Sequence, residues 1–168
     1  MRYQASEPVK QVRFSTPMRW QYTKPMIREA TKEDIPRIQE MGSRSLREGP
    51  YRDIISDNPE QTGKLALEVM QKGIVLVAEE DGKLVGILAF IMFPHYFTAE
   101  LTAGEMIWWV EPEYRQSFTA LCLLRGAERL ARTHGAKRFQ FSAPTAAVGA
   151  AYEAMHYVPI ETTYLKAL

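Results

Sequence analysis

Hydrophobic and polar positions change their period along this chain, and the changes mark the elements of a mixed α/β fold. β-branched residues crowd Ile74–Ala78 and a second apolar run covers 84–93, which indicates two strands. Asp81 and Gly82 between them are typical of a tight hairpin turn, so we expect the strands to be antiparallel. The apolar run Glu100–Val110 predicts the next strand.

Apolar residues recur at helical spacing in other segments. The strongest pattern covers 119–134 and stops at Gly135, which predicts an amphipathic helix with a glycine after its end. Helix-start residues at 31–34 and 57–59 each precede a further helical pattern, and 146–155 predicts a short helix of small residues.

Three shorter segments complete the predicted sheet. Residues 27–30 and 138–142 favour strands, and 157–168 favours a terminal hairpin with a break near Pro159. A long helix joins the strands at 100–110 and 138–142, so these two should be parallel neighbours. The fold class is therefore α/β (α+β): a mostly antiparallel mixed sheet of about six to seven strands, with helices on both faces.

Composition adds mainly exclusions. A chain of 168 residues with 46% hydrophobic and 24% charged residues suits one globular domain. Its net charge of +1 makes nucleic acid an unlikely partner, and no apolar run is long enough to span a membrane. The single Cys122 excludes an internal disulfide, and no secretory leader is recognisable, so we expect a cytoplasmic protein.

Residues 1–25 differ from the domain predicted over 26–168. Five basic side chains face one acid in 1–24, a net charge of +4, and aromatic residues alternate with them. We interpret this segment as an irregular arm that lies over the domain or over a partner subunit. A nucleic-acid-binding arm and a disordered segment are the alternatives.

Few residues suggest metal or nucleophile chemistry. His95, His134 and His156 are scattered without zinc-like spacing, so we expect no metal. Cys122 falls on the buried stripe of the predicted helix, which favours a core role. No nucleophile elbow and no Walker motif occurs.

The most informative segment is Trp108–Ala120. An apolar strand ends at Val110, a Pro-containing turn follows, and a helix then begins. The first amides of a helix lack internal partners and carry partial positive charge, so the turn could bind a phosphate-bearing cofactor on the amides of 115–120.

These residues resemble the GNAT N-acetyltransferase superfamily. Val110–Arg115 is similar to that family's strand-to-loop lead-in, and Arg115 and Ala120 match the two ends of its cofactor loop. Phe118 departs from the pattern, because the family usually has glycine there. Residues 151–157 and 27–35 resemble its late and opening segments, so the resemblance covers roughly 26–168.

The resemblance implies a GNAT fold that holds acetyl-CoA between two splayed parallel strands and acetylates a primary amine of a small molecule or a protein. It implies that backbone groups near Val110 bind the pantetheine arm and the thioester oxygen, while the helix start binds the pyrophosphate. The implied cofactor-binding residues are Trp108, Trp109, Val110, Arg115, Gln116, Ser117, Phe118, Thr119 and Ala120.

Two catalytic roles follow from the same resemblance. Tyr152 matches the general acid, because a phenol with a pKa of about 10 stays protonated at neutral pH; the alternative is a helix tyrosine that only packs. Glu105 is the candidate base, Glu100 a weaker one, and a solvent-facing strand glutamate the alternative. Strict alternation puts Glu105 on the face of Ile107 and Trp109, unless a bulge changes the parity.

Two other functions compete with an active acetyltransferase. Phe118 and the basic arm motivate a catalytically degenerate GNAT-fold interaction module, and an unrelated α/β binding domain is the third hypothesis. In the family, the acceptor site corresponds to residues 44–60 and 94–98, whose charges of both signs favour no particular amine. Exposed terminal strands are compatible with a homodimer.

Overall fold

A single five-stranded sheet organises the computed structural model, which describes residues 24–167. The strands lie in chain order: β1 (Met26–Glu29), β2 (Gly73–Glu80), β3 (Lys83–Pro94), β4 (Leu101–Val110) and β5 (Arg138–Gln140). The first three pairings are antiparallel and the β4–β5 pairing is parallel, which confirms the predicted mixed sheet and its parallel pair.

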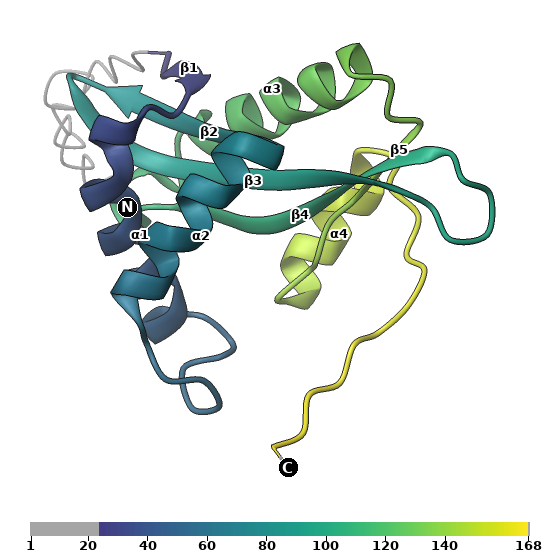
Figure 1. The fold of residues 1–168 in the computed structure, drawn as a ribbon. Helices are drawn as coiled ribbons and strands as arrows, with labels where there is room; N and C mark the ends of the chain where they lie inside the picture. The colour runs from purple at the N-terminus through teal and green to yellow at the C-terminus, as the bar shows by residue number, and fades with distance from the viewer. Residues whose placement is uncertain (1–23, 168) are drawn as a thin grey trace, which may run out of the picture.

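Helices cover both faces of the sheet, also as predicted (Figure 1). α1 (Ile35–Glu48) and α2 (Pro59–Lys72) pack on one face, whereas α3 (Thr119–Thr133) and α4 (Ala146–Ala154) lie on the other. Two short 3-10 helices, η1 (Lys32–Asp34) and η2 (Pro112–Tyr114), precede α1 and α3.

Two apolar clusters form the core because side chains of the central strands alternate between faces. Leu88 and Phe90 of β3 are fully buried in one cluster with Leu123 of α3, and Ile87 of β3 is buried in the other with Met41 of α1. The sheet is therefore covered by apolar contacts on both sides, which fixes the positions of the strand ends where the candidate site lies.

The β2–β3 hairpin turns where the sequence predicts it. Asp81 and Gly82 have φ of 50° and 73°, the left-handed conformation that a two-residue hairpin turn requires. Glycine adopts this conformation without steric cost and aspartate tolerates it.

The end of the chain differs from the prediction. The terminal hairpin expected at 157–168 is wrong: residues 157–167 form no strand, and Leu168 lies outside the described residues. A two-stranded hairpin in so short a segment would bury little, and Pro159 lacks a backbone donor. This accounts for five strands rather than six to seven. The arm proposed for 1–25 lies outside the described residues, apart from Lys24 and Pro25.

Candidate functional site

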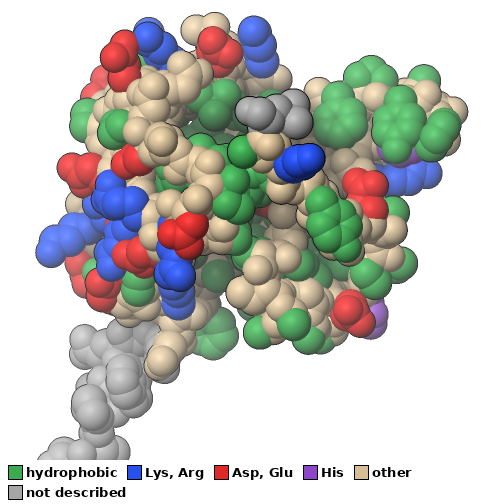
Figure 2. Space-filling model, turned by 90° about the horizontal axis from the view of Figure 1, so that it is seen from below, with side chains coloured by type: hydrophobic (Ala, Val, Ile, Leu, Met, Phe, Trp, Pro, Cys, Tyr) green, Lys and Arg blue, Asp and Glu red, His purple; other side chains and the backbone are tan. Residues whose placement is uncertain are grey.

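β4 and β5 separate after a short parallel pairing. β5 pairs only with Thr102–Gly104, whereas β4 continues to Val110 with β3 on its other side. From Glu105 onward, the second edge of β4 therefore has no partner strand in the described part of the chain. Seen from below, hydrophobic side chains line a hollow between the part that carries α1 and α2 and the part that carries α4 (Figure 2).

A β-bulge at Met106 changes which side chains face this opening. Ala89 pairs with Ile107 but Phe90 pairs with Glu105, so Met106 is the extra residue in β4. Glu105 lies opposite Phe90, on the α3 side of the sheet. The parity predicted by strict alternation, which placed Glu105 with Ile107 and Trp109, is therefore wrong, because the bulge reverses it.

The bulge brings Glu105 close to Tyr152, and the peptide units of Ser142 join them. The Ser142 backbone N–H donates to the Glu105 carboxylate over 2.9 Å, and the Tyr152 hydroxyl donates to the Ser142 carbonyl over 3.4 Å. Ser142 follows β5, so this contact spans the opening between the two strands. Glu105 is half-buried, and its carboxylate is hydrogen-bonded rather than directed only to solvent.

Burial shifts the titration of both groups. Desolvation raises the pKa of Glu105, although the Ser142 N–H partly opposes the shift. Burial raises the pKa of Tyr152 as well, and the negative charge of Glu105 raises it further. A carboxylate of raised pKa is a better proton acceptor, and the phenol is protonated at neutral pH, so the pair suits acid–base chemistry.

An aromatic cluster closes the opening on the α3 side. The centroid of the Trp108 ring lies 6.0 Å from that of the Tyr152 ring and 5.8 Å from that of the Phe141 ring. The ring centroids of Tyr157 and Tyr152 are 5.4 Å apart. The Tyr157 hydroxyl donates to Glu128 of α3 over 2.7 Å. These contacts hold Tyr152 in place and exclude water from one side of it.

Trp109 faces the opposite side of β4 from Trp108. Its ring is buried against the α1–α2 cluster, and the Arg115 guanidinium carbon lies 4.3 Å from the ring centroid. Arg115 Nε also donates to the Val110 carbonyl over 2.9 Å. The sequence predicted the segment but not that Arg115 folds back onto β4.

A buried carboxylate, missed by the sequence reasoning, joins α1 to the end of β4. Glu111 is 3% exposed and accepts from Arg37 at 2.5 Å, from Arg44 at 2.8 Å and from the Trp109 indole N–H at 3.3 Å. We call these four residues the Glu111 clamp. The available signal was the seven-residue spacing of the two arginines, which places them on one face of a helix.

The predicted phosphate turn is built without left-handed residues. Arg115 has φ of −67° and Phe118 −79°, so phenylalanine fits the backbone where the family usually has glycine. The amides of Arg115, Ser117 and Thr119 already bond within the chain. The Thr119 hydroxyl donates to the Glu80 carboxylate, another contact that the sequence did not predict.

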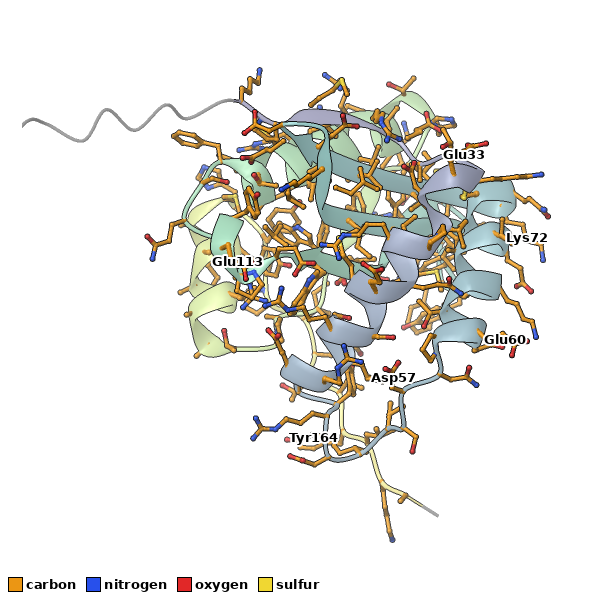
Figure 3. All side chains as sticks on the ribbon, turned by 90° about the vertical axis from the view of Figure 1, so that its left-hand side faces the viewer. Glu33, Asp57, Glu60, Lys72, Glu113 and Tyr164 are labelled. Atoms are coloured by element: carbon orange, nitrogen blue, oxygen red, sulfur yellow. The ribbon has the colours of Figure 1, made fainter. Side chains whose placement is uncertain are left out.

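The remaining candidates lie elsewhere. Glu100, the weaker base candidate, is paired with Arg138 at the beginning of β4. An open pocket of about 410 Å³ lies at the loop that joins α1 to α2, and its lining includes Arg47, Arg52 and Asp57. Figure 3 labels Asp57 on this loop. The β3–β4 hairpin that contains 94–98 is far from this pocket, so the two predicted acceptor segments are not adjacent (Figure 1).

Comparison with known proteins assigns the family. The pattern of the acetyltransferase (GNAT) family matches residues 39–157, more than two thirds of the chain. The chain belongs to the GNAT acetyltransferase family. Members of this family use acetyl-CoA, and the open edge of β4 beside the start of α3 agrees with the expected GNAT fold. No protein of curated function matches this chain in sequence.

Solved structures share the fold at low sequence identity. An acetyltransferase from Trypanosoma brucei has a TM-score of 0.69 at 15% identity, with 86% of this chain and 100% of that chain covered. Glucosamine-6-phosphate N-acetyltransferase from Arabidopsis thaliana has a TM-score of 0.68 at 12% identity, with 86% of this chain and 99% of that chain covered. An aminoglycoside N-acetyltransferase in complex with CoA has a TM-score of 0.69 at 14% identity, with 86% of this chain and 94% of that chain covered.

Residues 24–167 contain neither a membrane-spanning helix nor a metal-binding cluster. No helix among them is long and apolar enough to cross a bilayer. Within the same residues, no group of three or more His, Cys, Asp or Glu side chains is placed to hold a metal ion.

The Glu111 clamp yields a stability prediction. Replacing Glu111 by alanine removes the buried carboxylate that Arg37 and Arg44 share and leaves these arginines only partners that are more exposed. We therefore expect a loss of about 3 kcal/mol in unfolding free energy, the low end for a buried pair. Glu113→Ala is the matched control: Glu113 also contacts Arg44 but is 63% exposed, so its replacement should lower the unfolding free energy far less. Denaturant titration measures both; equal losses would contradict the clamp.

Glu105 yields a pH prediction. Its folded pKa lies above the unfolded value of about 4.3, so the folded state binds the extra proton. The stability that this proton contributes is complete below the unfolded pKa and is lost as pH rises through the folded pKa. Glu105→Gln cannot ionise and should not lose this stability. The unfolding free energy of the variant minus that of the wild type should therefore increase as the pH rises. Urea titrations across the range measure it; a constant difference would count against the prediction.

Proposed function

We propose that this protein is an N-acetyltransferase that moves the acetyl group of acetyl-CoA to a primary amine of a small molecule or a protein. The observation that carries the proposal is the meeting of Glu105 and Tyr152 at Ser142, beside the open edge of β4. Amine acetylation requires a base that takes the proton of the amine and an acid that protonates the leaving thiolate. Glu105 and Tyr152 place two such groups beside the gap between β4 and β5.

The residues present fit acetyl-CoA, which supplies the acetyl group as a thioester when it is bound. The edge of β4 at 108–110 offers backbone groups to an extended ligand, and an amide near Val110 would donate to the thioester oxygen. The start of α3 and the Arg115 guanidinium would attract the pyrophosphate. Because Glu80 places a carboxylate beside Thr119, the positive potential at this turn is weaker than at a helix N-terminus without a nearby carboxylate.

The proton steps follow from the coupling between the two catalytic candidates. Glu105 would take the proton from the attacking amine, directly or through water, and become neutral. Neutral Glu105 no longer raises the pKa of Tyr152 by its charge, so the phenol becomes a better donor to the leaving thiolate. Proton uptake by Glu105 therefore prepares Tyr152 for its own step.

A catalytically degenerate GNAT-fold interaction module is the second candidate. Two observations favour it: the phenylalanine at 118, and the Glu80 carboxylate at the turn that would hold the pyrophosphate. Both would lower cofactor affinity, because each reduces the access or the positive charge that a phosphate needs. The next two experiments separate the candidates.

Cofactor binding is the first test. Calorimetric titration with acetyl-CoA and with free CoA should give dissociation constants in the micromolar range, equivalent to about 8 kcal/mol at 1 μM. Arg115→Ala should weaken binding, whereas Arg125→Ala, a change at an exposed side chain of α3, should not. Absence of binding at millimolar cofactor would favour the interaction module.

Tyr152 is the test of chemistry. Tyr152→Phe should lower thiol release from acetyl-CoA by about 10²- to 10⁴-fold with the acetyl-CoA dissociation constant unchanged. Tyr157→Phe, in the same aromatic cluster, should retain activity. The assay screens primary amines: an aminoglycoside, a polyamine, an amino sugar and a peptide with a free N-terminus. Full activity in Tyr152→Phe would exclude the assigned role.

A further inference from the structure

Phe118 is a large aromatic residue at the surface where α3 begins. It is the N-cap residue of this helix, and 60% of its surface is exposed. The GNAT family usually has glycine at this position, so the ring is particular to this chain. Because so much of Phe118 is exposed, the ring contributes little to the core of the domain and is accessible to a ligand.

Leu121 extends this apolar surface along the helix. It follows Phe118 by three residues, a spacing that places two side chains on neighbouring positions of one helix face, and it is 41% exposed. We call Phe118 and Leu121 the apolar platform. Flat apolar groups of ligands bind to surfaces of this kind, because aromatic rings offer a large contact area with few rotatable bonds.

The polar groups of the same turn are poorly placed to supply all the affinity for a phosphate. The amides of Arg115, Ser117 and Thr119 already bond within the chain. The Glu80 carboxylate accepts from the Thr119 hydroxyl, so a negative charge lies at the position where a phosphate would bind. A neutral apolar group is not repelled by that charge. The apolar platform can therefore contribute affinity that the phosphate contacts lack.

The covalent structure of CoA places a suitable group beside the apolar platform. CoA consists of a pantetheine arm, a pyrophosphate and an adenosine with a 3′-phosphate, so only the ribose separates the adenine from the pyrophosphate. With the pyrophosphate at the turn formed by 115–120, the adenine lies next to the same turn. Adenine is flat and has two π-faces, and bases stack readily on aromatic side chains.

We propose that Phe118 stacks on the adenine of CoA, with Leu121 beside it, and that this contact selects CoA thioesters over the thioesters of carrier proteins as acyl donors. A carrier protein presents its acyl group on the same 4′-phosphopantetheine arm but without an adenosine, so it cannot use the apolar platform. This inference rests on the proposed function, because it takes the turn before α3 as the pyrophosphate site.

The backbone at Phe118 is compatible with this role. Its φ of −79° is ordinary for an L-residue, so a side chain is carried there without strain. Glycine at this position would let the backbone approach a phosphate more closely but would offer no ring. The replacement of glycine by phenylalanine thus moves part of the recognition from the phosphates of the cofactor to its base.

The experiment is calorimetric titration of the full chain with CoA and with 4′-phosphopantetheine, the latter measured by its competition with CoA. Phe118→Leu keeps an apolar side chain but removes the flat ring, so CoA binding should weaken by about fivefold or more, the lower end for a stacked base. The affinity for 4′-phosphopantetheine should not change. Phe118→Tyr keeps the ring and is the matched control, which should bind CoA as the wild type does.

Each other outcome overturns the inference in a recognisable way. An equal loss of affinity for both ligands would mean that the ring supports the turn rather than the adenine, and unchanged CoA binding in Phe118→Leu would mean that it does neither; both leave the proposed function intact. Tighter CoA binding in Phe118→Gly would mean that the ring obstructs the phosphates, as the interaction-module candidate expects. Absence of CoA binding in the wild type would overturn the proposed function together with this inference.

Discussion

The Glu111 clamp is the constraint on which the geometry of the site depends. A carboxylate that is almost fully buried must be matched by donors, and here two arginines of α1 and one indole of β4 supply them. The clamp therefore fixes α1 against the end of β4 at the residue where the chain turns toward α3. Arg115 reinforces this junction, since it contacts Trp109 and Val110 together. The turn from β4 to α3 is thereby tied to the α1 side of the opening.

The bulge at Met106 has a comparable role on the other face. An extra residue in β4 breaks the two-residue period, so Glu105 and Trp108 share a face although their spacing is odd. Without the bulge, Glu105 would point toward α1 and α2 and could not meet the Ser142 peptide. One irregular position thus determines whether the base candidate and the acid candidate lie in the same half of the molecule.

Much of the fold was predictable because its signals are local. The Asp81-Gly82 turn, the amphipathic pattern of α3 and the long crossover between β4 and β5 each specify one element or one pairing. The family resemblance located the strand-to-helix turn and Tyr152. The rest depends on tertiary contacts that leave little trace in the sequence. Nothing in 100–110 marks Met106 as a bulge, and the burial of Glu111 depends on arginines some seventy residues earlier. The terminal segment has strand-like residues, but pairing needs a neighbour that local sequence does not specify.

The pocket at the loop between α1 and α2 is lined by charged residues that lie mostly at the surface. Its charged residues pair mainly among themselves, Arg52 with Asp53 and Arg47 with Asp57, and all but Asp57 are mostly exposed. Surface pairs of this kind contribute little to folding, so substitutions here are tolerated. Changes to these surface pairs leave the clamp, the bulge and the contact of Glu105 and Tyr152 with Ser142 in place. Sequence drift in this family member is therefore expected to concentrate in one surface loop, with the rest of the domain inherited intact.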